Sequence, residues 1–264
     1  MTTLALTVRD SVTMFRRDLR HQRRYPSVTG ILIGMPVVFL LLFVYILGGT
    51  LGSGLGDPAG GRDAYIQYVV PGILVITIAA VTTGTAISVA TDMTEGIIAR
   101  FRTMAISRSA VLSGHVLGAT CQTLLALAVV TIVAVLIGFR SSTGVGSWIA
   151  AAGVLLLITV ALTWFAVALG TVAKSVESAS NLLMFLIFLP FLGSGFVPTE
   201  SLPSGVSWFA AHQPFTPFIE TIRGLLLGTE IGTSAVQTVA WCIAIALASW
   251  LWARSSYDRR SVRA

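Results

Sequence analysis

The chain has 264 residues, of which 55% are hydrophobic and only 11% are charged, and its mean hydropathy is +0.87. Soluble domains usually carry about 25% charged residues, so a water-soluble protein of this length could not bury so much apolar surface. The net charge of +6 needs no nucleic-acid partner, because membrane orientation and attraction to anionic lipid headgroups explain it. The composition therefore predicts a multi-span membrane protein.

Residues 1–28 predict an amphipathic helix at the membrane surface. Apolar side chains recur every three or four residues and arginines follow an adjacent face: Val8, Val12, Phe15, Leu19 and Arg9, Arg16, Arg20, Arg23. Such a helix either anchors in the lipid surface or docks against a cytoplasmic partner, and the pattern allows both. Because arginines continue to Arg24 and no small-residue cleavage site follows a short apolar core, we expect no cleaved signal peptide.

Six later segments are apolar over about 20 residues, the length that a helix needs to cross a bilayer. We therefore expect an all-α polytopic fold, with one six-span transmembrane domain over residues 29–253 and a basic tail over residues 254–264. The expected spans are residues 29–50, 65–90, 111–139, 148–173, 178–197 and 232–252.

The basic residues orient these spans. Fourteen of the 17 lysines and arginines lie at alternate boundaries of the apolar runs, and the other boundaries hold only Arg62, Arg140 and Arg223. Because basic residues resist translocation, this alternation predicts that both termini lie in the cytoplasm. Six spans with cytoplasmic ends are typical of one half of a twelve-span assembly.

The connection between the second and third spans predicts a short cytoplasmic helix. Asp92 and Glu95 have the spacing of a capping pair, and Ile97, Phe101 and Met104 share one face. An apolar face beside several arginines indicates a helix that docks on a partner, or one that lies on the membrane. The residues that would make the contact are Asp92, Glu95, Gly96, Arg100, Phe101, Arg102, Met104 and Arg108.

The segment between the fifth and sixth spans, residues 198–228, lies on the outer side in this topology. It is too apolar for a solvated loop and too interrupted by prolines for a span, so we expect short re-entrant helices in the outer leaflet. Glu220 and Arg223 are i, i+3 neighbours and can pair. The residues of interest are Pro198, Pro203, Pro214, Glu220 and Arg223.

Two stripes of side chains are candidates for a substrate path. Hydroxyl residues follow one face of the second span, and an amide with two aromatic residues follows one face of the fifth: Thr77, Thr85, Ser88 and Asn181, Phe185, Phe188. Each stripe is equally typical of plain helix packing, although an intramembrane Asn is costly without a partner. The two cysteines lie in apolar runs, and the chain carries no motif for a metal site.

The order of three motifs resembles the permease subunits of type-2 ABC exporters, and most closely the bacterial anthracycline-resistance permeases. The motifs are E-G-x-x-x-R-F-R-x-x-x-I-S-R from Glu95, V-P-x-x-x-L-P from Val197, and P-F-T-P followed by I-R-G-L-L-L-G from Pro214. Together they extend the resemblance over nearly the whole chain.

The resemblance implies a division of labour between chains. Residues 1–28 would be a connecting helix, Asp92 to Arg108 would be the coupling helix on a separate ATPase, and residues 198–228 would cap the export path. The working unit in the bacterial cytoplasmic membrane would hold two ATPase chains and two permease chains, either a homodimer or a pair of close paralogues. This chain has no G-x-x-x-x-G-K-[ST] loop, so ATP and magnesium would be bound by the ATPase and the chain itself would hold no cofactor.

Several functions remain open at this stage. The leading one is export of hydrophobic or amphiphilic drugs, and export of lipid or polysaccharide by the same superfamily is the nearest alternative. A haem-export permease would need more outer ligands than His212. An intramembrane enzyme would need paired catalytic groups, and a structural scaffold would need none; the sequence favours neither.

Overall fold

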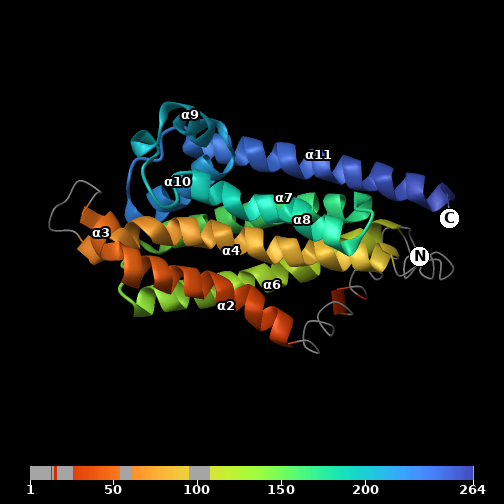
Figure 1. Ribbon diagram of the computed structural model, residues 1–264, viewed down its shortest axis with the longest axis horizontal. Coiled ribbons are helices and arrows are strands. Elements are labelled where there is room, and N and C mark those ends of the chain that lie inside the picture. The colour runs from red at the N-terminus through yellow and green to blue at the C-terminus, as the bar shows by residue number, and fades with distance from the viewer. Residues whose placement is uncertain (1–12, 14, 17–25, 54–60, 95–107, 264) are drawn as a thin grey trace.

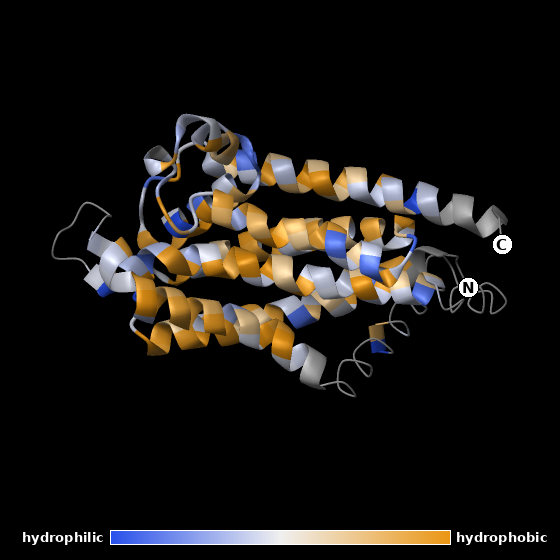
Figure 2. Cartoon of the chain, viewed as in Figure 1, coloured by the Kyte–Doolittle hydropathy of each residue, from blue (hydrophilic) through white to orange (hydrophobic). Residues whose placement is uncertain are grey.

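The computed structural model describes residues 13, 15–16, 26–53, 61–94 and 108–263, and this part of the chain contains helices and no strand (Figure 1). The long helices lie side by side along one axis. The end of α11 marks one end of the bundle, called here the C-terminal end, and α9 lies at the opposite end, called the α9 end. Apolar residues run along the helices between the two ends (Figure 2).

The chain passes repeatedly between these two ends. In order, the elements are α2 (Pro26–Leu42), η1 (Phe43–Leu47), α3 (Gly48–Ser53), α4 (Gly61–Thr94), α6 (Arg108–Leu136), α7 (Val145–Val172), α8 (Val176–Phe188), η2 (Leu189–Leu192), η3 (Thr199–Ser201), α9 (Ser204–His212), α10 (Phe215–Leu227) and α11 (Ser234–Arg263).

Helix α4 is the centre of the bundle. In its most apolar window 72% of the residues are buried, compared with 17% for the α2–α3 segment and for α11. It packs against α2, α3, α6, α7, α8 and α10. Glycine permits one close approach: a Cβ on Gly170 of α7 would lie 2.8 Å from the Ala86 carbonyl oxygen in α4. Small side chains therefore let α7 contact the α4 backbone directly.

Five helical segments among the described residues are long and apolar enough to cross a membrane. They are Thr29–Ser53, Gly61–Thr94, Leu112–Leu136, Val145–Val172 and Ser234–Ser256. These segments agree with five of the six expected spans to within a few residues. The molecule is therefore a multi-pass membrane protein whose described part is helical.

The expected fifth span, residues 178–197, differs most from the structure. Its helix covers Val176–Leu192 as α8 and η2, and the chain then turns at Gly193. Seventeen residues rise by about 25 Å, less than the roughly 30 Å of a hydrocarbon core. Residues 193–196 are buried in this turn and Val197 is half-buried, so the apolar residues Phe196 and Val197 do not continue the helix. The total of six spans stays a prediction.

The two terminal segments predicted from the sequence are described to different extents. Helix α11 continues to Arg263, so the expected basic tail of residues 254–264 begins as a helical extension of the last span. Most of the expected amphipathic helix, residues 1–28, lies outside the described residues.

Candidate functional site

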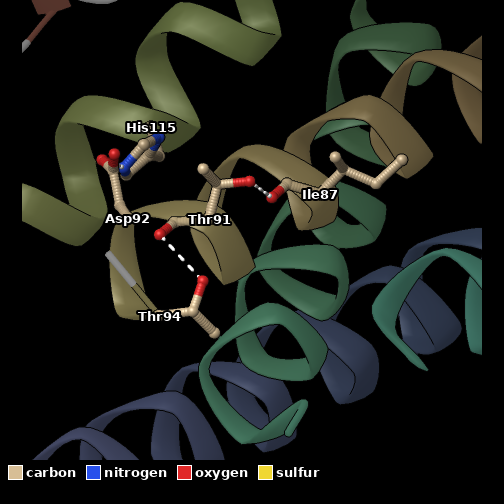
Figure 3. A network of polar contacts seen from close by, with 5 residues as sticks. All are labelled: Ile87, Thr91, Asp92, Thr94 and His115. Atoms are coloured by element: carbon tan, nitrogen blue, oxygen red, sulfur yellow. Dashed lines mark hydrogen bonds and ion pairs between the residues drawn. The ribbon is translucent and has the colours of Figure 1, made fainter. Parts of the chain in front are cut away.

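A buried polar contact joins α4 and α6 near the C-terminal end of the bundle (Figure 3). Nε2 of His115 in α6 lies 3.1 Å from Oδ2 of Asp92, two residues before the end of α4, and both side chains are about one-tenth exposed. An ionised Asp92 carboxylate can only accept a hydrogen bond, and in that state the imidazole Nε2 is the donor. The contact links the two helices that residues 95–107 connect.

Threonine hydroxyls hold the last turn of α4 in helical form (Figure 3). Thr91 Oγ1 donates to the Ile87 carbonyl at 2.9 Å, and Thr94 Oγ1 donates to the Ala90 and Thr91 carbonyls at 2.9 and 3.1 Å. Asp92 therefore lies inside α4, and the interpretation that it opens a new helix as a cap was wrong. The capping spacing alone does not tell whether the preceding helix has ended.

The other expected coupling residues fall beyond what the structure describes. Glu95, Gly96, Arg100, Phe101, Arg102 and Met104 lie outside the described residues. Arg108 is the first residue of α6, and its side chain is outside them as well. Their contact with a partner stays a prediction.

Two apolar clusters surround the Asp92–His115 contact. One joins α4, α6, α7 and α11, and consists of Val89, Leu112, Val116, Val167, Ala168 and Ala253 with Met93 and Trp164 packed against it. The other joins α4 to the start of α8, and consists of Ala90, Ala173 and Ala179 with Val176 packed against it. The C-terminal end of α4 is therefore packed against the ends of four other helices.

The hydroxyl stripe of α4 faces the interior of the chain. Thr77 is fully buried and Thr85 is 7% exposed, and their Oγ1 atoms donate to the Ile73 and Val81 carbonyls one turn earlier. Ser88 is half-buried. Hydroxyls that bond within their own helix are satisfied without a ligand.

The aromatic stripe of α8 faces outward. Phe185 is 74% and Phe188 is 51% exposed, and Asn181 is exposed one turn earlier on the same side. Within one chain the structure does not bring the α4 and α8 stripes together, because one is buried and the other lies on the surface. A path along Thr77 would require a neighbouring helix to move away from α4.

Arg223 organises the α9 end of the bundle. Its Nη2 donates to the Tyr68 carbonyl of α4 at 3.2 Å and to the Ser194 carbonyl after α8 at 2.6 Å, and its guanidinium lies 4.0 Å from the Tyr68 ring centroid. Burial lowers the pKa of Arg223, while Tyr68 and Glu220 act in the opposite direction. Arginine nevertheless stays charged.

Glu220 has a different partner from the one expected. Its carboxylate accepts a hydrogen bond from Ser234 Oγ of α11 at 2.8 Å, and no ion pair joins it to Arg223 among the described residues. Thr221 and Thr238 add a buried hydroxyl contact of 3.0 Å between α10 and α11. Although Glu220 and Arg223 are i, i+3 neighbours on α10, their side chains therefore contact different helices, α11 and α4.

Three of the four prolines in residues 198–228 mark helix starts. Pro198, Pro203 and Pro214 each directly precede the first residue of a helix, η3, α9 and α10 respectively. Proline suits this place because its fixed φ favours helix initiation and its missing N–H is not needed there. The expected short helices are therefore present, and their depth in a membrane stays a prediction.

Three hydroxyls that the sequence analysis did not single out cap the end of α10. In the α6–α7 loop, Ser141 and Ser142 donate to the Leu226 and Leu227 carbonyls at 2.6 and 2.5 Å, and Thr143 donates to the Leu225 carbonyl at 2.9 Å. In the sequence, the only sign of this contact is a run of three hydroxyl residues, and their spacing does not predict α10 as the partner.

Comparison with known proteins identifies the family. The model of the ABC-2 type transporter family matches residues 10–227. The chain belongs to this family. A daunorubicin resistance ABC transporter permease protein of Streptomyces coeruleorubidus is 29% identical over 226 residues, which cover 85% of this chain and 77% of the relative. A probable doxorubicin resistance ABC transporter permease protein of Mycobacterium tuberculosis is 26% identical over 247 residues, covering 92% and 85% respectively.

Proposed function

We propose that this chain is the permease subunit of an ATP-driven exporter that moves hydrophobic or amphiphilic molecules, including drugs, out across a bacterial cytoplasmic membrane. The observation that carries the proposal is the family match over residues 10–227, together with two drug-resistance permeases among the relatives. Lipid or polysaccharide export is the competing outcome of the test below.

A separate ATPase chain supplies the energy. The sequence carries no phosphate-binding loop of its own, and residues 95–107, between α4 and α6, have the apolar spacing and the arginines that predict a docking helix. Two ATPase copies would bind ATP and magnesium at the cytoplasmic side. The distribution of basic residues supports an orientation in which the C-terminal end of the bundle, with both termini, faces the cytoplasm.

A second permease chain completes the path. The outward face of α8 presents Leu182, Met184, Phe185 and Phe188, each more than half exposed. Asn181 lies beside them, and an amide facing hydrocarbon is costly, so a protein or cavity environment fits this face better than lipid. We infer that two such faces enclose the route, and that α9 and α10 close it on the outside.

Co-purification and reconstitution test this function. The chain purified with its ATPase in liposomes should hydrolyse ATP faster when daunorubicin is added and should accumulate the drug, whereas the chain alone should hydrolyse none. Stimulation by a lipid or an oligosaccharide but not by daunorubicin would favour the competing substrate class.

Substitutions in the docking segment test the site of ATPase contact. A desolvated aromatic anchor costs about 2 kcal/mol or more on truncation, and rim charges cost less. Phe101→Ala should therefore release the ATPase more than Arg102→Ala does, and equal, negligible effects would place the segment on the membrane instead.

A further inference from the structure

We propose that Asp92 and His115 are a positioning pair that makes the cytoplasmic ends of α4 and α6 move as one body when the ATPase acts on residues 95–107. The inference rests on the proposed function and goes beyond it, because it names the contact inside the permease through which the ATPase would shift the path helices.

The pair sits where the docking segment enters and leaves the bundle. Asp92 lies three residues before residue 95, and His115 lies in the second turn of α6, which begins at Arg108. The 3.1 Å contact between them therefore closes a ring through the whole connection. A force applied to residues 95–107 reaches both helices, and the contact prevents one helix end from moving without the other.

Apolar packing then carries the movement onward. Val89 and Met93 of α4 pack in the same cluster as Leu112 and Val116 of α6, and that cluster also includes residues of α7 and α11. Ala90, which directly follows Val89, packs in a cluster with Ala179 near the start of α8. The end of α4 is thus in direct contact with the helix that carries the exposed aromatic stripe.

A polar pair suits this task better than apolar contacts alone. Apolar surfaces can slide over one another with small change in energy, whereas a hydrogen bond to a buried carboxylate fixes distance and direction. Removing one partner leaves a buried polar group without its contact, while replacing both partners by apolar residues can leave stability nearly unchanged. The double replacement therefore separates positioning from folding.

The experiment measures how ATP changes the exposure of α8. A cysteine replaces Met184, which is 55% exposed, in a chain whose Cys121 and Cys242 are alanine. Its reaction with a maleimide is followed in the assembled complex, with and without ATP and vanadate. The variants are Asp92→Leu with His115→Leu, the exchanged pair Asp92→His with His115→Asp, and the unaltered pair.

We expect the leucine pair to assemble with the ATPase but to reduce the ATP-dependent change in labelling about fivefold or more, the range of typical coupling between sites. The exchanged pair should restore at least part of the change. Gln122→Leu is the matched control, because Gln122 lies seven residues after His115 on α6 but donates to Thr29 of α2 at 3.5 Å. It should leave the change intact.

The two proposals fail in different ways. If ATP alters the labelling equally with the unaltered pair and the leucine pair, the positioning role is overturned and the proposed function stands. If no ATPase associates with the unaltered chain, both are overturned. Loss of the change in Gln122→Leu as well would show a general sensitivity of α6 and would also overturn the specific role of the pair.

Discussion

The Arg223 guanidinium of α10 lies over the Tyr68 ring of α4, 4.0 Å from the ring centroid, and also bonds the Tyr68 carbonyl. The same Nη2 atom bonds the Ser194 carbonyl in the turn after α8. One side chain therefore ties three segments together, although Tyr68 and Arg223 are 155 residues apart in the sequence. The buried Nε of the same guanidinium has no hydrogen-bond partner among the residues that the structure describes.

Replacing Arg223 should destabilise the α9 end of the bundle even when the positive charge is kept. Arg223→Lys keeps the charge but loses the planar stacking on Tyr68 and the fixed geometry of the guanidinium. The Ser194 carbonyl, left without its donor, costs about 1–3 kcal/mol, whereas the Tyr68 carbonyl still lies within α4. We expect a lower thermal unfolding midpoint in detergent and weaker drug efflux, and a larger loss of both with Arg223→Leu.

Arg62→Lys is the control for this prediction. Arg62 also lies over a tyrosine ring, 4.3 Å from the Tyr45 centroid, but it is exposed. An exposed cation–π contact contributes about 0.5–1 kcal/mol at most, so this variant should unfold close to the unaltered protein. An equal loss at both positions would mean that Arg223 contributes only a surface contact.

The hydroxyl cap of α10 should stabilise the outer segment measurably. Ser141→Ala combined with Thr143→Val removes the donors to the Leu225 and Leu226 carbonyls. We expect a loss of about 1–3 kcal/mol in the free energy of unfolding, seen as a lower midpoint. Ser147→Ala, at the nearby start of α7, should change it little, since no described hydrogen bond uses that hydroxyl; the opposite ranking would contradict the cap.

Sequence periodicity and hydropathy predicted most of the helices because each span is a local feature. The expected span 148–173 and the observed Val145–Val172 differ by only a few residues. The exception is residues 193–197, which turn against α4 and do not continue the helix, although Phe196 and Val197 are apolar. A hydropathy scale cannot distinguish a buried turn from the end of a span, because apolar residues occur in both.

The candidate sites were less predictable because their contacts are distant in sequence. The prolines before η3, α9 and α10 carry a local signal, and short helices were correctly expected there. The sequence around Asp92 does not predict His115 as its partner, and the sequence around Thr77 does not predict that its hydroxyl faces the interior. Which face of a helix is buried depends on the neighbours that the fold brings to it.

Gly72 should tolerate no side chain. A Cβ there would lie 2.7 Å from the Gly195 carbonyl oxygen and 2.9 Å from the Gly195 Cα, so backbone would have to move. Overpacking of this kind typically costs about 1–3 kcal/mol. Gly72→Ala should therefore lower the unfolding midpoint and the yield, whereas Gly34→Ala in α2, where nothing lies within 4 Å of the new Cβ, should leave both near normal.

The outward face of α8 should meet a second permease chain. Phe185 is 74% exposed on a face that also holds Asn181, and the proposed two-chain path places this face between copies. Phe185→Cys, with Cys121 and Cys242 replaced by alanine, should then form a disulfide-linked dimer in membranes on mild oxidation. The measurement is the fraction of dimer on a non-reducing gel.

A cysteine at Ile132 is the matched control for this crosslink, because Ile132 is 59% exposed but lies on a different helix, four residues before the end of α6. Random collisions in the membrane would link both positions equally, whereas a specific interface links only position 185. If the dimer forms at 132 and not at 185, the α8 face lies against lipid and the path must be enclosed by other helices. If it forms at 185 and the yield changes with ATP in the assembled complex, α8 also moves during the transport cycle.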